Sequence, residues 1–284
     1  MKFCLYGNPT IDVIVVKNTT RISHGGGVYY SALPLIQRGF NVEVYSALSP
    51  RLVDHPIARY IIKLQYSTRT NVFMLEYTNS ERAVKVLEKA PPLYSWNTHR
   101  DLCYVVVNPV IGEVEISLLK LLRAKSRVLA VDIQGFVRTI STSGDVFLEP
   151  SGSVLDVLEL ADVVHADVNE AECLVKALGY HTTLSTSLSL LAKRVRGVLI
   201  ITRGSNKITV IHSGVVKDIE CENSYVALEK TGAGDYFLTV YLLNYLASGD
   251  AVDSVYKAHE EVTEWLKVRD KMLHHTPYYS TGEL

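Results

Sequence analysis

The chain has 284 residues and carries 29 Lys and Arg against 30 Asp and Glu, a formal net charge of -1 with neutral histidines. This balance excludes the basic surface of a nucleic-acid-binding protein and provides no attraction to an anionic membrane. With no signal-peptide core and no apolar run of membrane-spanning length, the chain predicts one cytoplasmic domain over residues 1–284 that acts on small molecules.

The first apolar stretch predicts a strand over residues 3–6 that breaks at Gly7 and resumes over 11–16. Asp12 is the one charged residue in the resumed stretch, and a buried carboxylate without a partner is costly. We expect Asp12 either to accept hydrogen bonds from ligand hydroxyls or to form a salt bridge or turn cap within the protein.

Three glycines at 25–27 open an amphipathic helix that ends near Gly39. Because glycine has no side chain, a ligand can lie against this backbone. The Lys-Ser/Thr pair of a Walker A loop is missing, so the turn is of another kind. Tyr29 and Tyr30 follow it and either line a pocket or belong to the core.

The next apolar segments predict a strand over residues 41–47 and a helix over 57–64. Two strand-like runs at 71–78 and 82–89 are joined by a short polar turn and predict a hairpin over 71–89. A hairpin inserted in an α/β chain is a candidate lid or dimer contact. The alternative is an edge extension of the main sheet.

From Cys103 onward strands and helices alternate, which predicts an α/β fold with a parallel sheet covered by helices. Ligands of such sheets collect beyond the carboxyl ends of the strands. Asn108 follows one strand and Asp132 ends the next, with Gln134 and Arg138 directly after it. We therefore expect these polar side chains to lie where a ligand binds.

Polar residues later in the chain have two explanations each. Asn169 begins a helix and either meets a ligand or caps the helix, with Glu172 reaching back in a capping box. Arg203 and Lys207 follow the strand over 197–202 and either contact phosphate or are solvated.

The cysteines indicate no metal site. They are scattered along the chain, without the spacing of zinc ligands, at Cys4, Cys103, Cys173 and Cys221. Most of them neighbour apolar runs, where a free cysteine packs as a small hydrophobic residue. We expect structural thiols at all of these positions.

The segment 229–235, with sequence Glu-Lys-Thr-Gly-Ala-Gly-Asp, opens an apolar helix over 236–246. A Gly-x-Gly turn at a helix N-terminus presents backbone N–H groups to a phosphate or a developing oxyanion. Asp235 would repel a phosphate bound directly, but it could deprotonate a hydroxyl that attacks a terminal phosphate. The alternative is a tight turn whose Asp only favours the helix N-terminus. A helix without a polar face is buried, which holds the turn in place.

Taken in order, four motifs resemble those of the ribokinase-like (PfkB) carbohydrate kinases: Gly25-Gly26, Asn169-x-x-Glu172, Thr202-x-Gly204 and Thr231-Gly-Ala-Gly-Asp235. The likeness runs from Gly7 to about Leu266. It implies a mostly parallel central sheet flanked by helices, with a reduced β lid. Only a short stretch separates Asp12 from Gly25, which is similar to a short-lidded branch that includes the myo-inositol kinases.

The resemblance implies in-line transfer of phosphate from ATP to a hydroxyl of a sugar or cyclic polyol, with Mg²⁺ and without a covalent intermediate. Asp235 would be the catalytic base, and the backbone of Gly232, Ala233 and Gly234 would form the anion hole. The acceptor would be bound by Asp12, Gly26, Asn108, Gln134 and Arg138. The donor nucleotide would lie along Thr202, Gly204, Thr231 and Asn169. Glu172 would hold the Mg²⁺ through water.

Two residues beside the anion-hole turn depart from the family pattern. Glu229 stands where the family usually has Asp, and Lys230 stands where a small or apolar residue is common. Some members bind a monovalent cation beside this loop, so these departures bear on whether such a cation is used here. Lys207 also replaces a frequent glycine of the nucleotide loop.

Two other functions compete with a sugar or polyol kinase. The first is a nucleoside kinase of the same family, in which Tyr29, Tyr30 or Phe136 would stack on the base. The second is a non-catalytic sensor of nucleotides or sugars on the same fold, against which the intact Asp235 argues. For the oligomeric state we expect a monomer or a homodimer.

Overall fold

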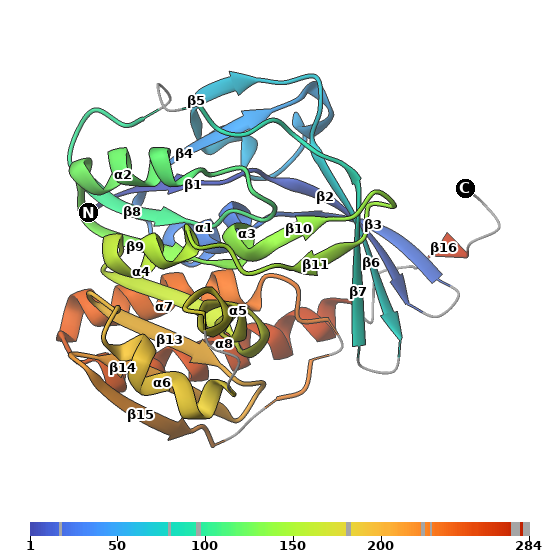
Figure 1. The fold of residues 1–284 in the computed structure, drawn as a ribbon. Coiled ribbons are helices and arrows are strands. Elements are labelled where there is room, and N and C mark those ends of the chain that lie inside the picture. The colour runs from blue at the N-terminus through green and yellow to red at the C-terminus, as the bar shows by residue number, and fades with distance from the viewer. Residues whose placement is uncertain are drawn as a thin grey trace.

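The computed structural model describes residues 1–16, 19–78, 81–94, 98–179, 183–222, 225–227, 229–273 and 279–280. The described chain forms a nine-stranded sheet, a five-stranded sheet and a two-stranded sheet (Figure 1). The large sheet contains, in spatial order, β15 (Val215–Glu220), β14 (Lys207–His212), β13 (Val198–Thr202), β12 (Val163–Asp167), β9 (Ser126–Asp132), β8 (Cys103–Val107), β1 (Lys2–Tyr6), β4 (Asn41–Leu48) and β5 (Ile61–Tyr66).

The strands from β13 to β5 are parallel, and β14 and β15 add an antiparallel edge. Parallel strands covered on both faces are apolar throughout, as in β8, where Val105, Val106 and Val107 are fully buried. One face packs against α2 (Ile116–Lys125), α4 (Val154–Leu160), α5 (Val168–Ala177) and α6 (Leu184–Ala192). The other packs against α1 (Gly27–Gln37), α7 (Ala233–Ser248) and α8 (Ala251–Leu273).

Helix α7 confirms the buried helix expected after the 229–235 turn. Its residues 235–242 are all buried, and Gly249 ends it with a left-handed C-cap whose N–H donates to the Tyr245 carbonyl. None of the helices in the described residues is both long and apolar enough to cross a bilayer. The burial of α7 holds its first turn in place at the carboxyl side of the sheet.

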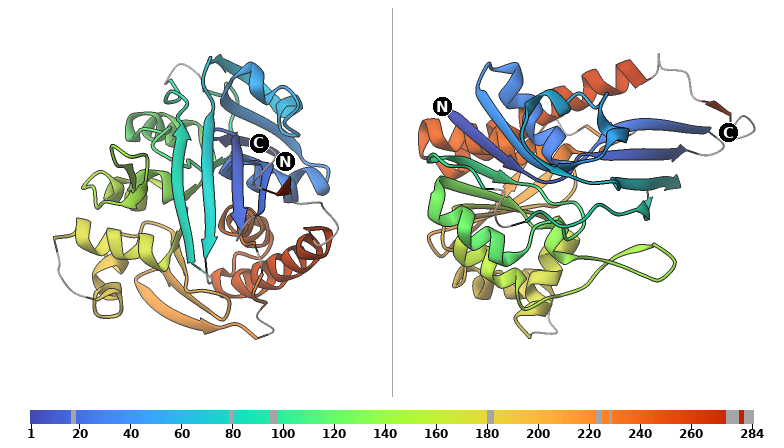
Figure 2. Two further views of the ribbon diagram at one scale, coloured as in Figure 1. Left: turned by 90° about the vertical axis from the view of Figure 1, so that its right-hand side faces the viewer. Right: turned by 90° about the horizontal axis from the view of Figure 1, so that it is seen from above.

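The five-stranded sheet stands beyond the carboxyl ends of the parallel strands (Figures 1 and 2). Its strands in order are β16 (Tyr279–Ser280), β3 (Thr19–Gly25), β2 (Thr10–Val16), β6 (Asn71–Thr78) and β7 (Glu81–Glu88). The hairpin predicted over 71–89 is present as β6 and β7. Strand β3 was not expected from the sequence, and β2 connects the hairpin to it. A two-stranded sheet of β10 (Arg138–Ile140) and β11 (Val146–Leu148) follows the short helix α3 (Gln134–Val137).

The helix expected over residues 57–64 is wrong. After the single turn η1 (Pro50–Leu52), the chain makes another single turn, η2 (Ala58–Tyr60), and then continues as strand β5. A short apolar run does not distinguish a strand from a helix by its pattern alone. Here the exposed edge of β4 decides, because β5 pairs with it in parallel.

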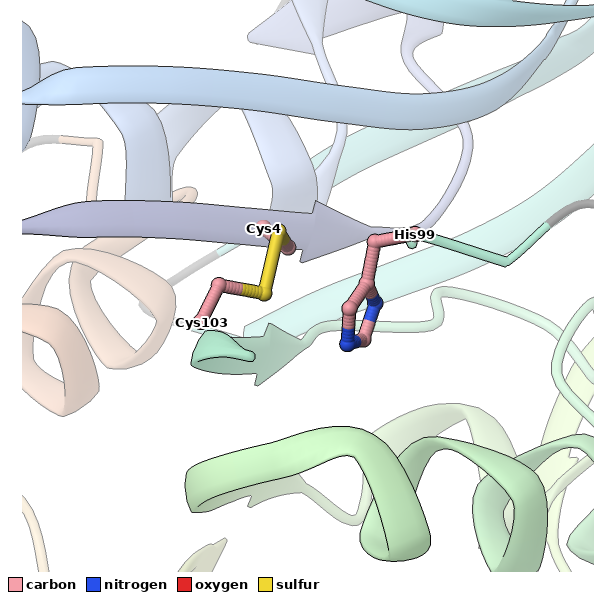
Figure 3. Close-up of side chains that lie close together, drawn as sticks. All are labelled: Cys4, His99 and Cys103. Atoms are coloured by element: carbon pink, nitrogen blue, oxygen red, sulfur yellow. A yellow bond between two sulfur atoms is a disulfide. The ribbon is translucent and has the colours of Figure 1, made fainter. Parts of the chain in front are cut away.

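The expectation of four free thiols is also wrong. Cys4 of β1 and Cys103 of β8 form a disulfide with a Cα–Cα distance of 6.2 Å, next to His99 (Figure 3). Cys173 and Cys221 are free and buried, as expected. The bonded cysteines are 99 residues apart in the chain, so only the order of the strands in the sheet brings them together.

Candidate active site

Asp235 occupies the third position of α7 with only 7% of its surface exposed. The side-chain amides of Asn108 and Gln134 donate to its Oδ1 at 2.9 and 3.0 Å. Among the described residues, no side chain donates a hydrogen bond to the other oxygen, Oδ2. Two donors on one oxygen fix the orientation of the carboxylate and leave the second oxygen for a ligand.

A pocket of about 440 Å³, counting the part open to solvent, lies between the two larger sheets at Asp235. Its polar lining contains the carboxylates of Asp12 and Asp235 together with Gln134 and Arg138. Its apolar lining includes Phe73, Leu75 and Val84 of the five-stranded sheet, where Asp12 of β2 is the register partner of Phe73. The predicted site residues that the structure brings together around this pocket are Asp12, Gly26, Gln134, Arg138, Thr231, Gly232 and Asp235.

The pKa of Asp235 is raised to about 7, because burial and the nearby Asp132 carboxylate disfavour its charged form. The Asn108 hydrogen bond and the positive charges of Arg138 and His165 act in the opposite direction. A carboxylate with a pKa near neutrality accepts a proton from a hydroxyl more readily than an ordinary aspartate does.

Asp132 does not line this pocket, although its position at a strand end predicted that it would face a ligand. Its Oδ2 lies 2.7 Å from Nδ1 of His165, and its Oδ1 accepts the backbone N–H of Gln134 at 2.9 Å. Burial alone would lower the pKa of His165, but the Asp132 carboxylate raises it on balance. This buried ion pair was missed because His165 stands inside an apolar strand and has no partner nearby in the sequence.

The turn before α7 is open to a ligand. Gly232 is the N-cap with φ of 80°, and no side chain caps this helix. A Cβ at Gly232 would lie 2.1 Å from the Tyr30 ring, and one at Gly234 would lie 2.8 Å from Cε1 of His165. Only glycine therefore fits at both positions without movement of the neighbouring rings.

The three backbone amides expected to form the anion hole are not equivalent. The N–H of Ala233 donates to the Lys230 carbonyl at 3.1 Å, so this amide is used inside the turn. Within the described part of the chain, the N–H groups of Gly232 and Gly234 meet no backbone acceptor. The structure thus leaves two of the three amides for an anion.

Asp12 is buried, with 3% of its surface exposed. The hydroxyl of Thr10 donates to its Oδ1 at 2.6 Å, and the residue also lines the pocket. A Cβ at Gly25 would lie 2.0 Å from Oδ2 of Asp12. The glycine turn therefore allows the backbone to approach this carboxylate closely.

Four residues expected on the donor side lie outside the pocket around Asp235: Thr202, Gly204, Asn169 and Glu172. Asn169 and Glu172 are exposed on α5. The capping box expected from them is wrong, because Asp167 is the N-cap and pairs with Glu170. The Thr202 hydroxyl lies 3.4 Å from Nε2 of His165.

Lys207, for which phosphate contact and solvation were both considered, is engaged within the protein. Its ammonium lies 2.8 Å from Asp218 and 3.6 Å from Glu220, which stand on the neighbouring strand β15. These carboxylates raise the pKa of Lys207 and keep its charge paired. A phosphate would have to compete with them for this side chain.

No cluster of three carboxylates able to surround a cation occurs in the described residues. The one group of three potential ligands found there is Cys4, His99 and Cys103, whose sulfurs are bonded to each other. Mg²⁺ usually keeps several waters and takes one or two carboxylates together with substrate phosphates. Glu172 is exposed on α5 and outside the pocket, so its expected water-mediated contact with Mg²⁺ stays a prediction.

A family model, that of the pfkB family carbohydrate kinases, matches residues 56–260. The chain belongs to the pfkB family of carbohydrate kinases. It is accordingly a phosphotransferase that acts on a sugar or polyol. The matched segment contains most of the site, from the apolar wall of β6 and β7 to Asp235. No curated protein matches the chain in sequence.

Solved structures with the same fold include several kinases. A pyrophosphate-dependent kinase of the ribokinase family, complexed with a pyrophosphate analog and myo-inositol, has a TM-score of 0.80 at 21% identity, covering 96% of this chain and 100% of that one. Ribokinase from Thermotoga maritima has a TM-score of 0.72 at 12% identity, covering 94% and 93%. The Methanocaldococcus jannaschii nucleoside kinase has a TM-score of 0.68 at 18% identity, covering 94% and 92%. The predicted ribokinase-like fold is confirmed.

Proposed function

We propose that this pfkB protein phosphorylates a hydroxyl of a cyclic polyol or sugar, with Asp235 as the base that accepts the hydroxyl proton. One observation carries the proposal. Asp235 is buried at the first turn of a helix without a side-chain cap, and Asn108 and Gln134 hold its Oδ1 while the residue lines the pocket. A base and an anion-binding turn are thus aimed at the same space.

In this mechanism the acceptor hydroxyl lies between Asp235 and the terminal phosphate of the donor. The carboxylate takes the proton as the oxygen attacks, and the free amides of Gly232 and Gly234 stabilise the charge on the transferred group. Arg138, which lines the pocket and donates to the Val110 carbonyl at 3.3 Å, adds positive charge on the acceptor side. A bound Mg²⁺ would offset the donor's phosphate charge, with Glu172 contacting it through water.

The shape of the pocket favours a cyclic polyol. Its lining offers donors and acceptors for several hydroxyls through Asp12, Gln134 and Arg138. The apolar side chains of Phe73 and Leu75 in the same lining suit the C–H face of a ring. The myo-inositol in the pyrophosphate-dependent kinase of the same fold supports the same class of acceptor.

The tyrosines that could stack on a nucleoside base are engaged with protein partners. The Tyr30 ring packs against Gly232 and lies under the guanidinium of Arg269, 5.3 Å from its centroid. The Tyr29 ring makes an edge contact with the His55 ring, with 5.1 Å between the ring centroids. These contacts favour a polyol over a nucleoside as the acceptor.

The phosphoryl donor has two candidates. ATP is the donor that the family resemblance implies. Pyrophosphate is the second, because the structure with a TM-score of 0.80 is that of a pyrophosphate-dependent kinase. Rates measured with each donor, at equal concentration and with excess Mg²⁺, distinguish the two.

The proposal is tested by combining these donors with a panel of acceptors: myo-inositol, ribose, fructose 6-phosphate, adenosine and cytidine. We expect myo-inositol or a related polyol to be phosphorylated, and Asp235→Asn to reduce kcat by ~10²–10⁴-fold with little change in donor affinity. Asp253→Asn, at an exposed residue of α8 paired with Lys257, is the control and should leave kcat unchanged. Donor binding without phosphorylation of any acceptor would instead support a sensor.

A further inference from the structure

The anion-hole turn is attached to two arginines through one buried carboxylate. Glu229 is only 5% exposed, and its Oε1 lies 2.6 Å from Nη2 of Arg269, on α8. Its Oε2 is paired with Nη2 of Arg21, on β3. Arg21, 208 residues before Glu229, and Arg269, 40 residues after it, therefore bind the same carboxylate.

Arg269 also binds the backbone of the turn. Its Nη1 donates to the carbonyl of Thr231, the residue just before Gly232. Its guanidinium lies over the rings of Tyr30 and Trp265, at 5.3 and 5.2 Å from their centroids. One planar cation thus holds a carboxylate and a carbonyl of the turn at once, and two aromatic faces fix its position.

Both arginine side chains are mostly buried, with 11% and 15% exposed. Arg269 holds its positive charge against the Thr231 carbonyl, one residue before the N-cap Gly232. In a poorly hydrated site, a positive charge beside the turn favours an anion at the amides of the turn.

A monovalent cation beside this turn, which the family resemblance allows, does not fit these residues. Such an ion needs oxygen ligands, and a carboxylate is the strongest oxygen ligand for a cation in this turn. The carboxylate of Glu229 is already bound by Arg21 and Arg269, and Arg269 also binds the carbonyl of Thr231.

We propose that Arg269, with Arg21, is the built-in cation of the anion-hole turn: it positions the free amides for the transferred phosphate and makes the reaction independent of monovalent cations. The proposal rests on the proposed kinase function. Two contacts connect the same turn to the five-stranded sheet. Arg21 binds Glu229, and the hydroxyl of Tyr77 lies 2.7 Å from Oγ1 of Thr231. Arg269 is the cleaner residue to test because it binds the turn's backbone directly.

The first measurement needs no variant. Initial rates of the wild-type enzyme are compared in K⁺, Na⁺, Cs⁺ and tetramethylammonium chloride at constant ionic strength. We expect rates that agree within about twofold, since the guanidinium groups already bind the Glu229 carboxylate and the Thr231 carbonyl. Stimulation by K⁺ of more than about tenfold over tetramethylammonium would overturn the inference and leave the kinase function standing.

The second measurement uses Arg269→Ala, which opens the oxygens that the guanidinium occupies. We expect kcat to fall by roughly 10²-fold with a smaller change in acceptor KM, because the amides lose their position in the transition state. Added guanidinium chloride, at concentrations that do not unfold the protein, should restore about tenfold of this loss. Arg269→Lys keeps the charge without the two-point contact, so we expect an intermediate kcat.

Arg38→Ala is the matched control. Arg38 also joins α8 to another helix, through Glu261 and the Pro34 carbonyl, but it does not contact the turn. We expect the Arg38→Ala variant to have the kcat of the wild type, with no change when guanidinium is added. An Arg269→Ala variant with wild-type kcat, or a folded one whose loss guanidinium does not relieve, would show that Arg269 has no positioning role.

Binding of inorganic pyrophosphate keeps this test separate from the test of the proposed function. If no acceptor is phosphorylated, the kinase proposal fails, but calorimetry of pyrophosphate binding still tests the turn. We then expect equal affinity of the wild type in K⁺ and tetramethylammonium, and weaker binding by Arg269→Ala that guanidinium improves. Affinity of the wild type that depends on K⁺ contradicts the inference.

Discussion

The first turns of α5 and α7 share a buried acid but differ in how the helix N-terminus is capped. Each has a buried acid at its third position, Glu170 in α5 and Asp235 in α7, and burial raises the pKa of both. In α5 the Asp167 side chain accepts the Glu170 N–H at 2.8 Å, and Glu170 accepts the Asp167 N–H at 2.9 Å. In α7 the N-cap is Gly232, and no side chain caps the helix.

The difference shows how the N-terminus of a helix is left open to a ligand. A capping box satisfies the first amides of α5 with the helix's own carboxylates, so they are not available to a ligand. The glycines of α7 leave amides open, and Asp235 points to Asn108 and Gln134 from other segments of the chain. Amides are thus left open to an anion where the local cap is missing and the acid is held by residues from other segments.

The largest expected effect comes from adding a methyl group to the open turn. In Gly232→Ala the new Cβ would lie 2.1 Å from the Tyr30 ring at a φ of 80°, so the turn or the ring must move. We expect kcat/KM to fall by ~10²-fold or more, as when an oxyanion donor is lost. The control is Gly179→Ala, at a φ of 81° just beyond α5, where nothing lies within 4 Å. Equal activity loss in the two variants would mean that backbone strain alone explains the result.

The second effect is the pH dependence of turnover. Because the pKa of Asp235 is raised to about 7, its carboxyl stays protonated in mild acid and the base form prevails only above that pH. We expect kcat/KM to rise about tenfold per pH unit below the midpoint and to level off above it. Arg138→Gln removes a charge that lowers this pKa, so the midpoint should move to higher pH.

The matched measurement for α5 is the pH profile of Glu170→Gln, which retains an acceptor for the capping box. We expect its midpoint to remain near that of the wild type, because the Glu170 carboxylate contacts the Asp167 N–H and Arg138, at 3.8 Å, and makes no hydrogen bond to Asp235. A midpoint that disappears in this variant would assign the titration to Glu170 and contradict the role of Asp235.

A smaller effect is expected at Glu172, an exposed residue of α5. Glu172→Gln should raise the Mg²⁺ concentration needed for half-maximal rate by several-fold, about 2–5, because a water-mediated contact contributes little binding energy. A titration of Mg²⁺ at saturating donor measures this change. Glu159→Gln, an exposed residue of α4 paired with Arg194, serves as the control. An unchanged Mg²⁺ requirement would remove Glu172 from the metal site.

The smallest effect on catalysis is expected from Asp167→Ala, which breaks the capping box of α5. It should lower the free energy of unfolding by about 1 kcal/mol and leave kcat within about twofold of the wild type. Urea unfolding and initial rates measure the two quantities. A loss of activity as large as that of Gly232→Ala would contradict the division of roles between the two helix starts.

The sequence by itself determined the local features of this protein. The Gly-Ala-Gly turn, the apolar helix behind it and the alternation of strands and helices are visible in short windows, because backbone freedom and burial depend on neighbouring residues. These features were sufficient to predict the fold class and to name Asp235 as a candidate base, a role that stays a prediction.

Only the tertiary structure decided which partners the polar groups meet. The Asn108 amide that orients Asp235 is 127 residues away in the chain, and Arg21 is 208 residues from Glu229. The same holds for Asp132 with His165, for the Cys4–Cys103 bond, and for β5, whose pairing with β4 replaced the expected helix. The physical reason is that an ion pair or hydrogen bond depends on distance in space, which sheet order sets and no short window of sequence contains.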